Sequence, residues 1–189
     1  MVTAGSSIRP LITWVIFGLF CPAALGILLG QVIWEHELSH QLLAPGLVLF
    51  CIDQARMAVI DLEQITVAKQ HLQDPRLDQF YWITVSTIVI ELGGFYLASF
   101  FLGWGSLVVL LSQIWFNTLA TIHLLPAPAI DIQPRSFQSR LPVLIANGVG
   151  VILISLWIMA MGQLWIDSIL WGMTFAYGIV KYCLISTRD

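Results

Sequence analysis

Residues 10–34 read PLITWVIFGLFCPAALGILLGQVIW, a run of 25 residues without one Asp, Glu, Lys or Arg. A helix that crosses the hydrocarbon core of a bilayer needs about 20 apolar residues, whereas the apolar core of a secretory signal peptide has about 7–15. We therefore expect a membrane helix that the protein retains. This stretch decides the fold class, because it requires lipid rather than water around the chain.

The whole chain has the composition of a membrane protein. Of its 189 residues, 58% are hydrophobic and only 10% are charged, whereas soluble domains carry about 25% charged residues. The net charge is −3 and there is no basic run, so nucleic acid is not an expected partner. The three cysteines, Cys21, Cys51 and Cys183, lie far apart and form no CxxC pair, so the sequence predicts no disulfide framework.

Further uncharged stretches predict four more membrane helices. Residues 92–130 are long enough for most of two passes, with Gly103-Trp104-Gly105 as the expected turn between them. Residues 141–166 are also uncharged, and Met161-Gly162-Gln163 predicts a turn before the last helix. The five expected helices are residues 11–44, 80–102, 106–125, 141–162 and 164–183.

Residues 45–79 are compatible with two interpretations. Pro45-Gly46 is expected to break the first helix, and Asp53, Arg56 and Asp61 interrupt short apolar runs. The segment is either a sixth, polar membrane helix or a short hairpin or re-entrant segment at the membrane edge. The predicted fold class is all-α: residues 1–189 form one polytopic membrane domain, a bundle of about five transmembrane helices, or six.

The distribution of basic residues bears on this choice. Six spans would place all eight Lys and Arg residues on the cytoplasmic side, and five spans would place seven of the eight there. The charge pattern thus slightly favours six spans, and the choice depends on the chemistry of the candidate site.

The stretch His36-Glu37-Leu38-Ser39-His40 spells HExxH, the signature of zinc metalloproteases. On a helix, the two histidines lie on one face and can hold one Zn²⁺, while Glu37 can take a proton from a zinc-bound water. Histidines at a membrane boundary also often form only hydrogen bonds at the level of the lipid headgroups. A zinc site needs a third ligand, for which the candidates are Asp131, His123, Glu91, Asp53 and Asp61.

Together with a second motif, this stretch resembles the site-2 protease family of intramembrane zinc metalloproteases. The family carries HExxH and, at the end of a later helix, Asn-x-x-Pro-x-x-x-x-Asp-Gly, whose frame is followed by residues 123–131, HLLPAPAID. The resemblance covers roughly residues 11–183. The residues that it assigns to the site are His36, His40 and Asp131 as zinc ligands, Glu37 as general base, and His123 or Asn117 as the group that orients substrate or stabilises the oxyanion.

The resemblance implies a zinc-dependent endopeptidase that cleaves a single-pass membrane protein within the lipid bilayer. A shared site needs both motifs on one side of the membrane. Five spans bring both to the cytoplasmic side, and we therefore expect five spans, with residues 45–60 as strands that clamp the substrate in extended form. The oligomeric state stays open.

Two alternative functions follow from differences between this sequence and the family motifs, and from acidic residues that the zinc site does not use. Ser39 and Ile132 stand where the family has glycine, and His123 stands where it has asparagine. These departures favour a protease-like but inactive membrane scaffold or assembly factor. A third hypothesis is a small transporter or channel with Glu91 and Asp53 on a polar path, and this hypothesis predicts six spans.

Overall fold

The computed structural model describes residues 5–124 and 132–186, which form six α-helices and one two-stranded sheet. In chain order the elements are α1 (Gly5–Leu28), the π-helical turn η1 (Leu29–Ile33), α2 (Leu38–His71), α3 (Pro75–Ala98), α4 (Leu102–Leu119), β1 (Ile122–Leu124), β2 (Ile132–Pro134), α5 (Phe137–Ile158) and α6 (Gln163–Ser186).

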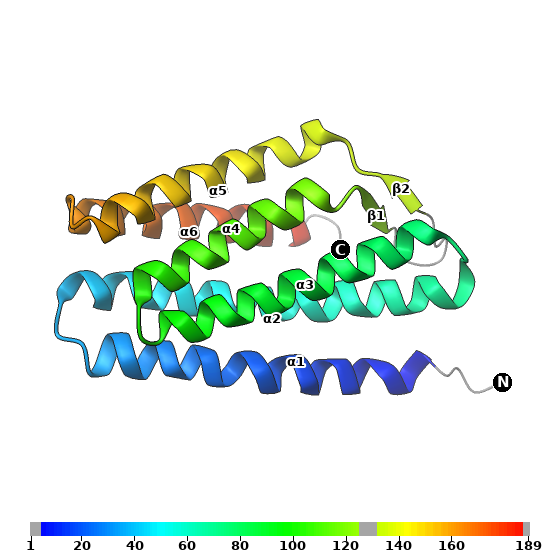
Figure 1. The fold of residues 1–189 in the computed structure, drawn as a ribbon, viewed down its shortest axis with the longest axis horizontal. Helices are drawn as coiled ribbons and strands as arrows, with labels where there is room; N and C mark the ends of the chain where they lie inside the picture. Colours follow the sequence, from blue (N-terminus) through cyan, green and yellow to red (C-terminus); the bar gives the residue numbers. More distant parts are fainter. Residues whose placement is uncertain (1–4, 125–131, 187–189) are drawn as a thin grey trace.

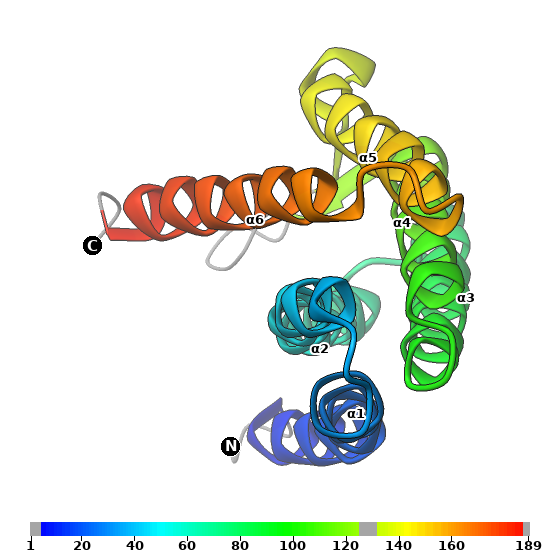
Figure 2. The same cartoon turned by 90° about the vertical axis from the view of Figure 1, so that its left-hand side faces the viewer.

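Helices α1 to α5 run antiparallel in succession, so their links alternate between two ends of the bundle (Figure 1). Residues 34–37, 99–101 and 159–162 link helices at one end, which we call the turn end. Residues 72–74 and the β1–β2 hairpin lie at the other end, the hairpin end. Figure 2 shows α3, α4 and α5 as one layer beside α1 and α2, with α6 crossing the bundle obliquely.

Five helices are long and apolar enough to cross a membrane, which confirms the predicted fold class of a multi-pass helical bundle. Large apolar side chains point outward, among them Trp14 at 78% exposed and Phe100 at 77%, as expected where lipid is the solvent. The five candidate spans are Pro10–Ile33, Leu38–His71, Pro75–Ala98, Leu102–Leu119 and Phe137–Ile158.

The second of these spans corrects the expectation for residues 45–79. The first helix ends before residue 34, and residues 38–71 form one continuous helix in place of a membrane-edge hairpin. Pro45 lies inside this helix. A proline has no backbone N–H, so the Gln41 carbonyl, four residues earlier, loses its helical donor. The neighbouring Leu42 carbonyl accepts a hydrogen bond from Trp171 Nε1 of α6, which ties this part of the helix to another element. The two paired strands are instead residues 122–124 and 132–134, where His123 pairs with Gln133.

Glycines at the turn end serve close packing rather than the turn that we expected. The turn between α3 and α4 lies at residues 99–101, and Gly103 and Gly105 belong to the first turns of α4. A Cβ on Gly105 would overlap the backbone of Ala98. A Cβ on Gly30 would likewise overlap the Ser99 carbonyl. Such small-residue contacts are a common way to pack helices in lipid.

The turn predicted at Met161-Gly162-Gln163 is confirmed. Gly162 has a φ of +66°, in the left-handed region that favours glycine, and α6 begins at Gln163. The link after η1 and the strands before α5 lie at opposite ends of the bundle, as in the six-span alternative (Figure 1). Among the described residues only five helices qualify as candidate spans, however, and α6, which corresponds to the predicted span 164–183, is not one of them.

Candidate functional site

The HELSH stretch is not helical throughout. Residues 35–37 lie in no helix or strand, and Glu37, whose backbone is extended (φ −73°, ψ 124°), is the residue before the first turn of α2. His36 therefore precedes the helix on which His40 lies, and the two imidazoles do not share a helical face. His36 is exposed, and its backbone N–H donates to the Glu35 carboxylate at 3.0 Å.

His40 is held by contacts within the bundle. Its Nδ1 lies 2.8 Å from Gln31 Oε1, and Gln31 Nε2 donates to the Ser99 carbonyl at 2.9 Å. The imidazole also packs on the Trp157 ring at 4.9 Å between centroids, and its Nε2 lies 3.6 Å from Glu37. These contacts connect η1, α2, α3 and α5, which is a structural role for the histidine.

The other predicted site residues lie toward the hairpin end. His123 is exposed on β1, and Asn117 is buried near the end of α4, where its side chain donates to the Gln113 carbonyl at 2.8 Å. Asp131 lies outside the described residues. Within the part of the chain that the structure describes, no three His, Cys, Asp or Glu side chains gather into a metal site. Because the predicted third ligand is not described, the zinc site stays a prediction.

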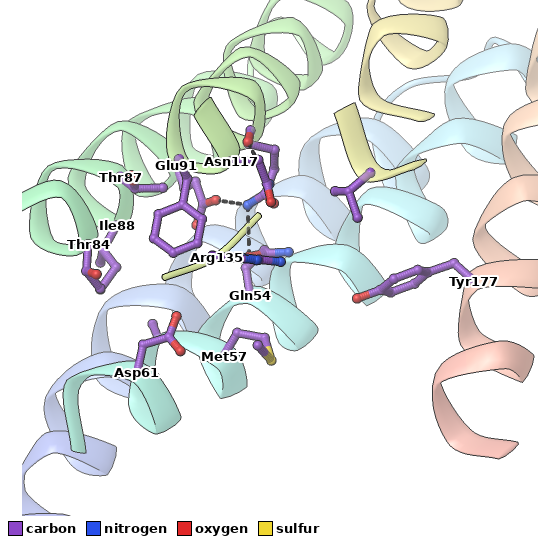
Figure 3. Close-up of a pocket in the computed structure, with 14 residues that line it drawn as sticks. Gln54, Met57, Asp61, Thr84, Thr87, Ile88, Glu91, Asn117, Arg135 and Tyr177 are labelled. Atoms are coloured by element: carbon purple, nitrogen blue, oxygen red, sulfur yellow. Dashed lines mark hydrogen bonds between the residues drawn. The ribbon is translucent and has the colours of Figure 1, made fainter. Parts of the chain in front are cut away.

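A cavity of about 190 Å³, whose lining is mixed and more apolar than polar, lies between α2, α3 and α4, in the half of the bundle nearer the hairpin end (Figure 3). Arg135 of the β2–α5 link, Val143 of α5 and Tyr177 of α6 complete its wall. The lining residues recur at helical spacing on each helix, so one face of each helix meets the cavity. They are Gln54, Met57, Ala58 and Asp61 on α2, Thr84, Thr87, Ile88 and Glu91 on α3, and Gln113, Phe116 and Asn117 on α4.

Glu91 is the most deeply buried acid in this wall, at 2% exposed. Its Oε1 accepts a hydrogen bond from Gln113 Nε2 and a longer one, 3.5 Å, from Ser112 Oγ. Gln113 Nε2 also donates to Gln54 Oε1 at 3.1 Å, which joins α2 to α4 through the same amide. An ionisable side chain at membrane depth is costly, and these donors offset part of that cost.

One hydroxyl in the wall has no partner. Thr84 is 2% exposed, and its Oγ1 makes no hydrogen bond within the described chain. The neighbouring Thr87 hydroxyl, by contrast, donates to the Ile83 carbonyl at 2.8 Å. A buried polar group without a partner costs about 1–3 kcal/mol, so Thr84 is better satisfied when something occupies the cavity.

Two arginines shape the hairpin end of the cavity. Arg140, buried at 7% exposed, donates through Nη1 to the carbonyls of Asn117, Thr118 and Ala120 at 2.9, 3.2 and 3.2 Å. It thereby caps the last turn of α4, where a cation is favoured by the helix dipole. Its Nη2 also donates to the Arg135 carbonyl at 3.4 Å, and the Arg135 backbone N–H donates to the Thr121 carbonyl at 2.8 Å.

Burial, followed by the charge of Arg140, lowers the pKa of Arg135 below its ordinary value, while the Asp61 carboxylate raises it. The Arg135 guanidinium is therefore repelled by Arg140 and attracted by the Asp61 carboxylate.

The sequence predicted Glu91, Asp61 and Asn117 as candidates but missed most of this wall. Gln54, Thr84, Gln113 and Arg135 were not candidates. A signal was present, since Thr84, Thr87 and Glu91 lie three and four positions apart, and Gln54 and Asp61 lie two helical turns apart. Reading that period requires treating residues 45–71 as a helix, which Pro45-Gly46 argues against.

Comparison with known proteins adds no relative: no family model, curated protein or solved structure matches this chain.

Proposed function

We propose that this protein is a small membrane carrier that binds a polar solute in the cavity between α2, α3 and α4. The observation that carries the proposal is Glu91, an acid 2% exposed within a candidate membrane span, which lines a cavity rather than a packed interface. Intramembrane acids are rare, and those beside a polar cavity typically mark the path of a solute or ion.

The surrounding groups support binding rather than simple packing. The wall combines amides, hydroxyls and charges from three helices that contact one another, and Thr84 leaves a hydroxyl unpaired there. Ligand sites between membrane helices are usually built in this way, with a few convergent polar groups in apolar surroundings.

We further infer that the hairpin end faces the cytoplasm. Lys69, Arg76, Arg135 and Arg140 lie at or near this end, whereas residues 34–37, 99–101 and 159–162 at the turn end contain no Lys or Arg. This is the asymmetry of the positive-inside rule. The cavity is then nearer the cytoplasmic surface, and HELSH lies at the opposite side.

Intramembrane zinc proteolysis stays a prediction that the described residues do not support. His40 is engaged by Gln31 and Trp157, and His36 lies in the link before α2. One zinc per purified chain, together with peptide cleavage lost in Glu37→Gln, would restore that hypothesis. The scaffold alternative has no specific observation in its favour.

Cysteine labelling tests the carrier proposal without knowledge of the solute. In a variant whose native cysteines are replaced by serine, Thr87→Cys should react with a polar, membrane-impermeant thiol reagent, because a thiolate forms only where water reaches. In vesicles, a carrier cavity must be reached from each side in turn, so we expect labelling from both sides.

The matched control is Val89→Cys on the same helix, since Val89 is 63% exposed toward lipid and should stay unlabelled. Labelling of Thr87→Cys from neither side would reject the carrier and leave a closed polar core.

A further inference from the structure

Charges of both signs line the cavity without pairing. Asp61, Glu91 and Arg135 all contribute to its wall. Among the described residues, no ion pair or hydrogen bond joins the Arg135 guanidinium to either acid. The Asp61 carboxylate nevertheless attracts the Arg135 guanidinium, although the two side chains form no ion pair. The cavity separates these opposite charges and leaves room for a ligand between them. Charge interactions with such a ligand are stronger where water is excluded.

The Arg135 guanidinium is held at the cavity and makes no hydrogen bond with the described residues. Its backbone is held on both sides, by the Thr121 carbonyl and by Arg140, and its side chain enters the cavity (Figure 3). In the described chain its side-chain N–H groups make no hydrogen bond. A guanidinium offers five donors in a planar fork that fits a carboxylate in bidentate fashion.

Only one of the two carboxylate oxygens of Glu91 accepts hydrogen bonds from the described residues. Both hydrogen bonds that it accepts, from Gln113 and Ser112, end on Oε1. No described group donates to Oε2. Asp61, one helix away on α2, likewise accepts no hydrogen bond from the described residues. Two carboxylates with open acceptor positions suit an ammonium group, which carries three donors.

We propose that the solute is a small zwitterion of the α-amino acid class, with its carboxylate on Arg135 and its ammonium between Glu91 and Asp61. This identification rests on the proposed carrier function. The Thr84 hydroxyl is a second, independent indication, because it is buried, unpartnered and part of the same wall. It would bond to the carboxylate or ammonium of the bound molecule.

Size and charge narrow the ligand class. The cavity of about 190 Å³ is smaller than the roughly 300–1,000 Å³ of pockets for drug-sized ligands. A plain cation would leave Arg135 without an anionic partner, and a plain anion would lie against two acids. A charge without a partner is strongly unfavourable where it is buried, as at Glu91, and less so at the half-buried Arg135. A molecule with both charges therefore satisfies both sides of the cavity better than a singly charged one.

Binding to matched probes tests the inference on the full chain in lipid nanodiscs. The probes are glycine, alanine and leucine, with ethylamine carrying only the amine of alanine and propionate only its carboxylate. We expect at least one amino acid to bind at least about tenfold more tightly than either singly charged analogue. Arg135→Gln and Glu91→Gln should each weaken that binding by about tenfold or more, while Thr118→Val, on the exposed face of α4, should leave it unchanged.

The outcomes separate the two proposals. If ethylamine binds as well as the amino acids and Arg135→Gln has no effect, the zwitterion is rejected and a cation carrier remains. Propionate binding that survives Glu91→Gln rejects it in favour of an anion. If no probe binds although Thr87→Cys is labelled from both sides, the zwitterion is rejected and the carrier stands. A closed cavity in the labelling experiment rejects both.

Discussion

At the turn end, His40 pairs with Gln31, and Gln31 pairs with the Ser99 carbonyl. Not every buried polar group there is satisfied, since the side chains of Trp157 and Asp167 have no hydrogen-bond partner among the described residues. The HExxH sequence thus lies beside polar groups that pack the helices together, away from the cavity.

In the half nearer the hairpin end, the described residues leave Glu91 Oε2, the Thr84 hydroxyl and the Arg135 guanidinium without a hydrogen bond. These three groups line one cavity, whereas Trp157 and Asp167 do not. Position on a cavity wall, rather than resemblance to a motif, separates the binding region from the structural region here.

The largest effect should come from breaking the close packing at the turn end. Gly105→Ala places a Cβ against the Ala98 backbone, which cannot move aside, and should cost about 3 kcal/mol or more of unfolding free energy. Unfolding by denaturant in detergent measures this loss. Gly93→Ala is the matched control, since nothing lies within 4 Å of its added Cβ. Equal stability of the two variants would show that the α3–α4 contact is not tight.

The next effect concerns the arginine that caps α4. Arg140→Gln leaves three carbonyls without a charged donor and should cost about 2–3 kcal/mol, with weaker amino-acid binding because Arg135 loses one backbone contact. Arg140→Lys should recover only part of the stability, since an ammonium cannot span three carbonyls as a guanidinium does. Thermal unfolding and binding measure the two losses.

The control for this prediction is Arg135→Gln, which removes the same charge but no described hydrogen bond of its side chain. It should lower ligand affinity without lowering stability to the same degree. A loss of stability as large as that of Arg140→Gln would show that Arg135 is structural.

A smaller effect tests the structural role of the histidine at the turn end. His40→Ala removes the Gln31 hydrogen bond and the ring contact with Trp157 and should cost about 1 kcal/mol of unfolding free energy. His36→Ala, in an exposed link, should change stability by less than about 0.5 kcal/mol. Chemical unfolding measures both. Zinc bound to the wild type and lost equally from both variants would overturn the assignment and make this end a metal centre.

The smallest effect lies in the link at the hairpin end. Asp74 caps α3, and hydrogen bonds from the Arg76 side chain and backbone lower the pKa of its carboxyl below the ordinary 3.8. A lowered pKa in the folded state means that the group adds stability above that ordinary value, and that this stability is lost as the pH falls further through the folded pKa. Thermal unfolding between pH 5 and pH 2 should show slightly less acid loss in Asp74→Ala than in the wild type. Identical curves would contradict this role.

The sequence predicted those features of the fold that depend on local composition. The uncharged run at residues 10–34 required a membrane helix, and Gly162 required a turn, because each property belongs to the residues themselves. The course of α2 could not be predicted in this way. The turn before its Pro45 is held by a hydrogen bond from Trp171, 129 positions beyond Leu42, and its polar residues are tolerated because other helices cover them.

The candidate site shows the same limit. HExxH places both histidines on one helical face only if its residues are helical, and α2 begins at Leu38, after the extended Glu37. Glu91 was a candidate because acids are rare in apolar spans, but its partner Gln113 lies on α4, and Gln54, the second partner of Gln113, lies on α2. Their convergence is a tertiary property, which no spacing along one segment can show.

The 34 residues of α2 have a consequence for biogenesis. In the 18-residue apolar stretch that makes α2 a candidate span, half of the residues are buried inside the protein, against 22% for the span Pro10–Ile33. Helix α2 also carries Asp53, Arg56 and Asp61, each of which opposes insertion by about 2.5–3.5 kcal/mol at the centre of a lone helix. Helix α1 can therefore partition into lipid as it leaves the translocon. Helix α2 becomes a stable span only after α3 and α4 have been synthesised and can enclose its polar face. The order in which the segments settle in the membrane thus differs from the order in which they are translated.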